Sequence, residues 1–189
     1  MTDVNQETVA VEKIVKDILG AIDKEREREI ISRRYGLYER KETLEQIGEL
    51  LGITRERVRQ LEKATITNLK KEGMKLPHME GLSALFEQLL EENGGVATIE
   101  KLSGKITDEN SKIDQSRVAF FAQLIPSVTF LSENDNYNQA AALNSKYSEK
   151  NLKEAVTNTL KAIKAIGQPA SIQEIAGSMG HPDAKEVAS

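Results

Sequence analysis

The chain has 189 residues, of which 39% are hydrophobic and 30% are charged, a composition that suits one to three small folded units. It contains no cysteine, which excludes a disulfide framework and a thiolate metal site. The first residues, MTDVNQETVA, lack the basic and apolar regions of a signal peptide, and no apolar run approaches membrane-spanning length. We therefore expect a cytoplasmic protein with no membrane partner.

The net charge of −4 is distributed unevenly along the chain. Residues 54–71 carry six basic and two acidic residues, a balance of +4, whereas residues 79–147 carry five basic and ten acidic residues, a balance of −5. A polyanion such as DNA attracts the first segment and repels the second.

Two helices are expected before residue 40. The first, within residues 7–22, has aliphatic residues at helical spacing. The second runs to Arg34, with Asp23 as its expected cap, and Gly36 is expected to end it. We expect both helices to support the segment that follows, so that residues 7–72 form one small helical domain.

Residues 43–71, TLEQIGELLGITRERVRQLEKATITNLKK, predict two helices joined by a tight turn. Thr43 with Gln46 forms a capping box, and Gly52 suits the left-handed exit from the first helix. The first helix is expected to bury Leu44, Ile47, Leu50 and Leu51, and Gly48 leaves room for the second helix. Ile53 is expected to plug the turn, and Thr54 to cap the second helix.

The second helix is two-sided. Val58, Leu61, Thr65 and Leu69 share one face, and the opposite sector carries Arg55, Glu56, Arg59, Gln60 and Lys63. Arg, Glu and Gln are the residue types that read guanine, cytosine and adenine edges in the major groove. The spacing predicts a helix-turn-helix that binds DNA, although a charged helix face is also compatible with simple solvation.

Residues 18–71 resemble region four of the sigma-seventy family of bacterial sigma factors. The resemblance rests on DKEREREIISRRYGL, TLEQIGELLGITRERVRQLE and the trailing NLKK. It implies that Arg55, Glu56 and Gln60 read bases of a promoter element in double-stranded DNA. It also implies contact with core RNA polymerase through the first two helices. The residues that it places near phosphates are Arg57, Arg59, Lys63, Thr43, Arg34 and Arg26.

Lys70 to Pro77 reads as a linker, after which the chain changes character. Residues 79–147 predict three amphipathic helices followed by a hairpin around Asn134-Asp135-Asn136, which together make a winged helix. The layout and acidity resemble the HARE-type winged helix of the RNA polymerase delta subunit. With only Arg117 as a cation on its third helix, residues 114–125, this unit is expected to bind a protein partner rather than DNA.

Residues 148–189 predict the start of a second winged-helix-like unit, and we expect the natural polypeptide to continue past Ser189. The segments beginning at Thr43, Thr98 and Ser171 share a hydroxyl cap, an aliphatic, a polar pair, an aliphatic and a small residue. This pattern indicates an internal repeat, although any capped amphipathic helix reads similarly. The predicted fold class is therefore mainly α, with a helix-turn-helix domain, a winged helix and a partial third unit.

The sequence offers no catalytic constellation. His78 and His181 are isolated, so we expect no metal site, no cofactor and no enzymatic activity. Two hypotheses remain open. The first is a DNA-binding transcription protein of bacterial type; the second is a regulator that docks on RNA polymerase or on a sigma factor without reading DNA.

Overall fold

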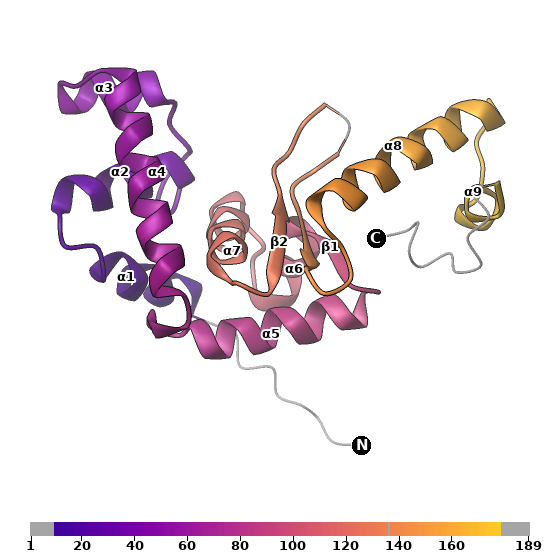
Figure 1. Ribbon diagram of the computed structural model, residues 1–189, viewed down its shortest axis with the longest axis horizontal. Coiled ribbons are helices and arrows are strands. Elements are labelled where there is room, and N and C mark those ends of the chain that lie inside the picture. Colours follow the sequence, from indigo (N-terminus) through magenta and orange to yellow (C-terminus); the bar gives the residue numbers. More distant parts are fainter. Residues whose placement is uncertain (1–9, 136, 179–189) are drawn as a thin grey trace.

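The computed structural model describes residues 10–135 and 137–178. It is mainly helical with one small antiparallel sheet, in agreement with the predicted fold class. In Figure 1 the ribbon forms a U: α3 and α4 make one arm, α5 crosses the base, and the sheet with α8 makes the other arm. Residues 7–9 of the predicted first domain, Asn136 of the predicted turn and residues 179–189 of the predicted third unit lie outside the described residues.

The first arm contains four helices, α1 (Val11–Gly20), α2 (Glu25–Tyr35), α3 (Leu44–Leu51) and α4 (Arg55–Glu72). Gly36 ends α2 in the left-handed conformation, as predicted. The predicted Asp23 cap is wrong, because α2 begins at Glu25 with Lys24 at its N-cap and no side-chain cap bond. The chain needs the extra residues to turn out of α1, whose own exit occupies Ala21 and Ile22.

The base and the second arm form the winged unit. A short 3₁₀ turn, η1 (Gly73–Lys75), leads to α5 (Met79–Glu92), and then come β1 (Val96–Thr98), α6 (Ile99–Ile106), α7 (Lys112–Leu124), β2 (Val128–Leu131) and β3 (Ala140–Leu143). The expected hairpin is confirmed, with Phe130 opposite Ala141. It also gains a strand that the sequence did not suggest: β1 pairs with β3, giving the order β1-β3-β2.

Two further helices, α8 (Glu149–Ile166) and α9 (Ile172–Ser178), follow the winged unit. The three hydroxyl caps on which the repeat rests are present. Thr43, Thr98 and Ser171 each accept a hydrogen bond from the backbone N–H three residues later. The caps fix where α3, α6 and α9 begin. None of the helices in the described ranges is both long and apolar enough to cross a bilayer.

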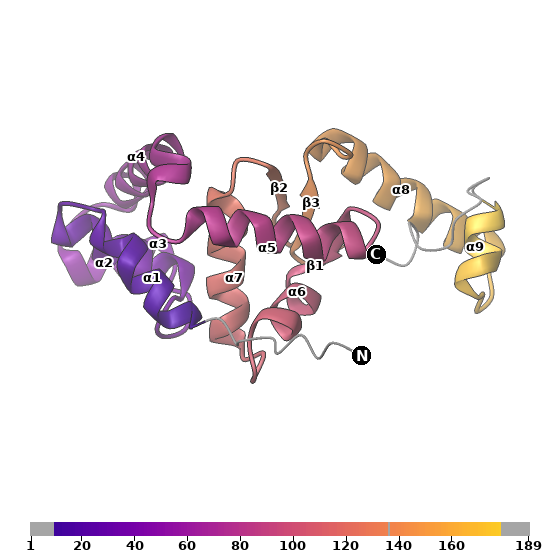
Figure 2. The same ribbon diagram turned by 90° about the horizontal axis from the view of Figure 1, so that it is seen from below.

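One hydrophobic cluster runs from the first arm into the winged unit. Its members include Ile18 of α1, Leu69 of α4 and Phe120 of α7, and all of them are buried. Figure 2 shows α7 lying between the α1–α2 pair and the sheet, with α5 crossing in front of α7 and the sheet. The first arm and the winged unit are therefore joined by close-packed side chains, and we call this contact region the joint.

Arg117 ties the two arms together at this joint. Its side chain is only 10% exposed, and its Nε donates to the Leu37 carbonyl over 2.8 Å. Its Nη2 pairs with Glu12 of α1 at 3.0 Å, and its Nη1 pairs with Asp114 at 3.4 Å. The guanidinium also lies 5.9 Å from the ring centre of Tyr38. The only basic residue of α7 beyond its first turn is thus used inside the protein.

Candidate nucleic-acid interface

The turn between α3 and α4 has the geometry that its sequence predicts. Gly52 has φ of +64°, and the Ile53 N–H donates to the Gly48 carbonyl over 3.0 Å. A Cβ on Gly48 would lie 2.8 Å from the Ile53 carbonyl oxygen, so this position tolerates only glycine without movement of the backbone. Left-handed φ is costly for residues with a Cβ, which explains the glycine at 52 as well.

A small cluster fixes the angle between the two helices. Ile30 of α2, Ile47 of α3 and Val58 of α4 are fully buried together, and Leu44, Leu51, Ile53 and Leu61 pack around them. The prediction that Leu50 joins this stripe is wrong, because its side chain is 55% exposed. At 100° per residue, position 50 lies about 100° from the line through 44, 47 and 51, which is enough to turn it toward solvent on a helix covered from one side.

Thr54 positions the start of α4. Its hydroxyl accepts from the Arg57 N–H over 3.2 Å, so the helix begins at Arg55 and its first turn points away from the cluster. The five residues of the predicted reading sector are all exposed, namely Arg55, Glu56, Arg59, Gln60 and Lys63. The predicted inner face is confirmed, with Val58, Thr65 and Leu69 buried.

The exposed face carries a chain of ion pairs that sequence reasoning missed. Arg55 Nε lies 2.9 Å from Glu45 Oε1 of α3, across the helix-turn-helix. Arg59 makes a two-point contact with Glu56, at 2.8 Å from Nε and 2.6 Å from Nη2. Gln60 donates to Glu56 and accepts from Arg57. The signal for the Arg55 pair was an acidic residue in the first turn of α3, next to the cap.

These contacts shift the pKa values of Glu56 and Arg59, and both shifts favour the charged forms. Hydrogen bonding from Arg59 lowers the pKa of Glu56, and the reciprocal bond raises the pKa of Arg59. Both side chains are more than half exposed, so they remain available to other partners. In the free protein, the reading face therefore presents paired charges that a ligand must rearrange.

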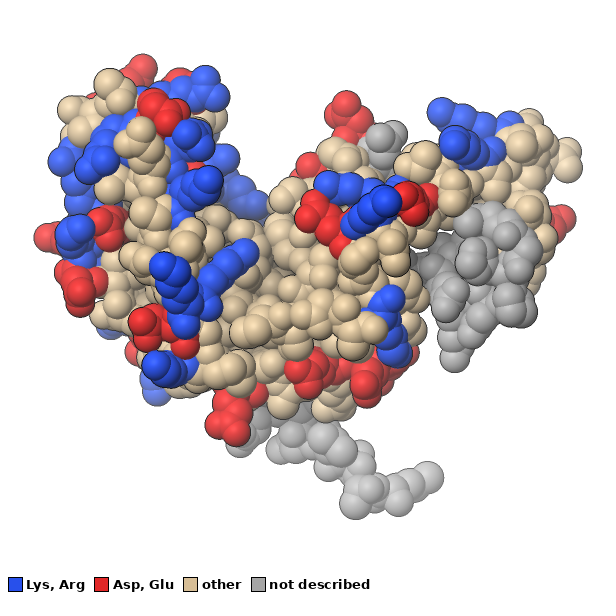
Figure 3. All heavy atoms as spheres, in the orientation of Figure 1, with Lys and Arg blue, Asp and Glu red and all other residues tan. Residues whose placement is uncertain are grey.

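The remaining predicted contacts lie around this face with different degrees of freedom. Arg57 and Lys63 are exposed on α4, and Thr43 sits at the N-terminus of α3 with its hydroxyl engaged in the cap. Arg26 donates to the Leu51 carbonyl over 2.6 Å, and Arg34 is half-buried between the Glu42 carbonyl and Glu62. Figure 3 shows Lys and Arg gathered over this arm, while Asp and Glu line the underside of the base.

No group of three His, Asp or Glu side chains that could hold a metal ion occurs among residues 10–135 and 137–178. His78 instead lies 2.7 Å from Asp17 of α1, at the point where the chain enters α5. This contact joins the linker to the first arm. The candidate functional site is therefore the exposed surface of α4.

Comparisons with known proteins place this surface within a recognised family segment. Residues 24–71 match the family model for sigma-70, region 4, in agreement with the resemblance seen in the sequence. RNA polymerase principal sigma factor HrdC of Streptomyces coelicolor is 52% identical over 46 residues, which are 24% of this chain and 14% of that protein. HrdD of Streptomyces viridifaciens is 45% identical over 56 residues, which are 29% of this chain and 17% of that protein.

A plant relative shows the same pattern. RNA polymerase sigma factor sigB of Arabidopsis thaliana is 44% identical over 57 residues, which are 30% of this chain and 9% of that protein. The chain thus spans less than a fifth of the length of these relatives, and the similarity concerns one segment. No solved structure matches the chain.

Proposed function

We propose that this protein is a DNA-binding transcription factor of bacterial type, which recognises a promoter element through its sigma region 4-like segment and contacts RNA polymerase. The observation that carries the proposal is the exposed sector of α4 on a rigid helix-turn-helix, with Arg55, Glu56 and Gln60 in its first two turns. Such a helix enters the major groove with its N-terminal residues against base edges. Work on DNA implies a cytoplasmic location in a bacterium.

In this proposal, Arg55 reads a guanine, Glu56 a cytosine and Gln60 an adenine. Binding requires exchange of the resident ion pairs, because Arg55 must leave Glu45 and Glu56 must release Arg59. Arg59 is then free to reach a phosphate. The exchange costs little where both groups are solvated, and it disfavours sequences whose bases do not replace the lost contacts.

Phosphate contacts position the helix in the groove without reading sequence. Arg57, Arg59 and Lys63 flank the reading residues, and the N-terminus of α3 offers backbone N–H groups beside Thr43. Arg26 and Arg34 donate hydrogen bonds to backbone carbonyls at the edge of the domain, so they contribute mainly to the positive electrostatic potential that attracts the phosphates. Together, these six residues form the proposed phosphate set.

The chain then divides into a sigma region 4-like unit at residues 7–72, a HARE-type winged helix at 79–147 and the start of a second such unit at 148–189. The winged unit is proposed to bind a basic protein surface of the transcription machinery. Its third helix, α7, would normally enter a groove, but most of its side chains are buried, and it packs against α1 and α2. Its charge of −5 adds repulsion from DNA.

The alternative function is a regulator that binds RNA polymerase or a sigma factor through protein contacts alone. One observation favours it: the arginines of the reading face are already neutralised by Glu45 and Glu56 in the free protein. A protein surface would satisfy such a face as well as DNA does.

Selection of duplexes from a random pool with the full-length protein separates the two functions. The DNA proposal expects a consensus to emerge, and it expects Arg55→Ala to lose the preference at one base pair. Lys63→Ala is the matched control and should weaken all sequences alike. A pool that shows no enrichment at low salt, together with co-purification with RNA polymerase, would establish the alternative.

A further inference from the structure

A hollow of about 380 Å³ lies where the two arms meet, and neither the reading face nor the shared core uses it. One wall is the loop between α2 and α3, with Lys41. The other walls are α6, the first turns of α7 and the wing between β2 and β3. The volume is in the range that small ligands occupy in proteins.

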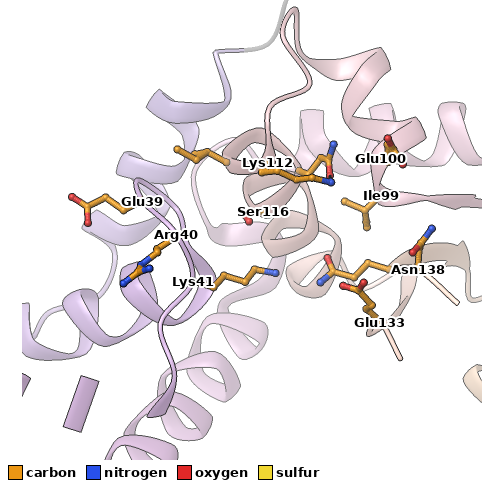
Figure 4. A pocket seen from close by; sticks show the side chains of 12 residues that line it. Glu39, Arg40, Lys41, Ile99, Glu100, Lys112, Ser116, Glu133 and Asn138 are labelled. Atoms are coloured by element: carbon orange, nitrogen blue, oxygen red, sulfur yellow. Dashed lines mark hydrogen bonds between the residues drawn. The ribbon is translucent and has the colours of Figure 1, made fainter. Parts of the chain in front are cut away.

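Lys41 is the group that reaches furthest into this hollow. In Figure 4 its side chain extends from the loop toward Glu133 on the wing. Glu39 and Arg40 line the same hollow, but in this view their side chains extend to the other side of the loop. Its Cγ lies 2.8 Å from the position that a Cβ on Gly36 would take, so the stem of Lys41 packs on the left-handed turn that ends α2. This packing aims the ammonium group across the joint.

The Lys41 ammonium has no ion pair among the described residues. Burial lowers its pKa, and the nearby Arg34 acts in the same direction, whereas Glu133 opposes them. A cation that is partly removed from water and lacks a bonded carboxylate gains more from an incoming anion than a fully solvated lysine does.

Further hydrogen-bond donors line the hollow beside the Lys41 ammonium group. Ser116 of α7 and Gln139 beside β3 line the same hollow, and Lys112 approaches from the first turn of α7. A second hollow of about 220 Å³ shares Lys41, Ser116 and Gln139, and it leads to Arg34. Because the two hollows share three lining residues, we call them together the joint trough.

We propose that the joint trough binds a phosphate ester through Lys41, with Lys112, Ser116 and Gln139 completing its hydrogen bonds. Phosphate oxygens accept several donors at once, and ammonium groups with hydroxyl and amide donors satisfy them. The carboxylate of Glu133 faces Lys41 and competes with the anion. Two further acids line the hollow, Glu100 on α6 and Glu39 on the loop between α2 and α3.

Two sources could supply this phosphate: a free molecule such as a nucleotide, or the backbone of DNA that extends beyond the reading helix. The loop that carries Lys41 leads directly into Thr43 at the start of α3, so a duplex on α4 passes nearby. The proposal does not depend on sequence reading by α4, because inorganic phosphate and a mononucleotide test it directly.

The experiment uses the full-length protein and three variants, Lys41→Gln, Arg40→Gln and Glu133→Gln. Calorimetric titration with inorganic phosphate and with adenosine monophosphate measures the free ligands. Anisotropy titration with a short and a long duplex measures the backbone. Arg40→Gln is the matched control, because it removes the same charge from a neighbouring lining residue whose side chain extends to the opposite side of the loop from Lys41 and Glu133.

We expect Lys41→Gln to weaken phosphate binding by about tenfold, the usual scale for losing a hydrogen bond to a charged group. Arg40→Gln should leave it nearly unchanged, and Glu133→Gln should tighten it. If only the long duplex separates Lys41→Gln from Arg40→Gln, the source is the DNA backbone; if only the small anions do, it is a free phosphate ester. Equal behaviour of the Lys41 and Arg40 variants toward every probe would overturn the proposal.

Discussion

Replacing Arg117 by methionine tests the joint between the two arms. Methionine keeps most of the apolar stem, so the change removes the guanidinium with little loss of volume. Four contacts disappear: the bond to the Leu37 carbonyl, the pairs with Asp114 and Glu12, and the weaker contact with the Tyr38 ring. The contacts differ in value because their partners differ in burial.

The Glu12 pair contributes least, because that carboxylate is 68% exposed. The Leu37 carbonyl loses its side-chain donor inside the joint, which costs about 1–3 kcal/mol. Asp114 is 13% exposed but keeps two bonds from Ser111, so its loss falls below the 3–5 kcal/mol that is typical of stranding a buried charge. We therefore expect Arg117→Met to reduce the free energy of unfolding by about 2–4 kcal/mol.

Urea denaturation of the full-length protein, followed by circular dichroism, measures this loss. Glu12→Gln is the control and should cost about 0–1 kcal/mol, because it removes only the exposed partner. A loss for Arg117→Met no larger than that of Glu12→Gln would refute the reasoning, since it would mean that the guanidinium is not held in the joint.

Other predictions concern the reading face. Glu45→Gln frees Arg55 from its ion pair, so the affinity for random duplex should rise several-fold in an anisotropy titration. Glu49→Gln, on the same helix, is the control and should leave this affinity unchanged. Gly52→Val should lower the melting temperature, because a left-handed β-branched residue costs at least about 1–2 kcal/mol; Gly52→Asn should lose less. The pKa of Glu56, followed by NMR, should lie below 4.5 and should return toward 4.5 in the variant Arg59→Gln. Because the pairing with Arg59 depresses this pKa, any stability that the pairing adds is present at neutral pH. That stability is lost as the pH falls through the folded-state pKa of Glu56.

The sequence predicts local structure correctly where a few neighbouring residues determine it. The Thr43–Gln46 capping box, the left-handed Gly52 and the Ser171 cap are all confirmed, because each depends on residues at most three positions away. The inner face of α4 follows from its apolar spacing in the same way. These features fix the helix-turn-helix and its exposed sector.

Contacts between distant segments escaped prediction. Arg117 reads as a lone surface cation on an amphipathic helix, yet its partners Leu37 and Glu12 come from 80 and 105 residues away. The pair between Glu45 and Arg55 likewise depends on the crossing of two helices. Strand β1 has three residues, Val96–Thr98, which is too short to show alternation, and it forms only because β3 is there to pair with it.

The expectation that the winged unit binds a protein rather than DNA remains a prediction. The net charge of −5 on residues 79–147 predicts that this unit is repelled by DNA. The structure adds that eight of the thirteen residues of α7 are buried, which the charge balance alone did not indicate. The base-contact and phosphate-contact roles of individual residues remain predictions.

The most direct test of the account compares the full-length protein on a selected duplex and on a scrambled duplex of equal length and composition. Reading by Arg55, Glu56 and Gln60 predicts at least about a thousandfold preference for the selected site at physiological salt, the lower end for specific DNA-binding proteins. It also predicts that affinity for both duplexes falls steeply with salt, with a log–log slope of roughly −3 to −4 for three to five phosphates. Equal affinity for the two duplexes, or a flat response to salt, would contradict the claim that α4 reads DNA.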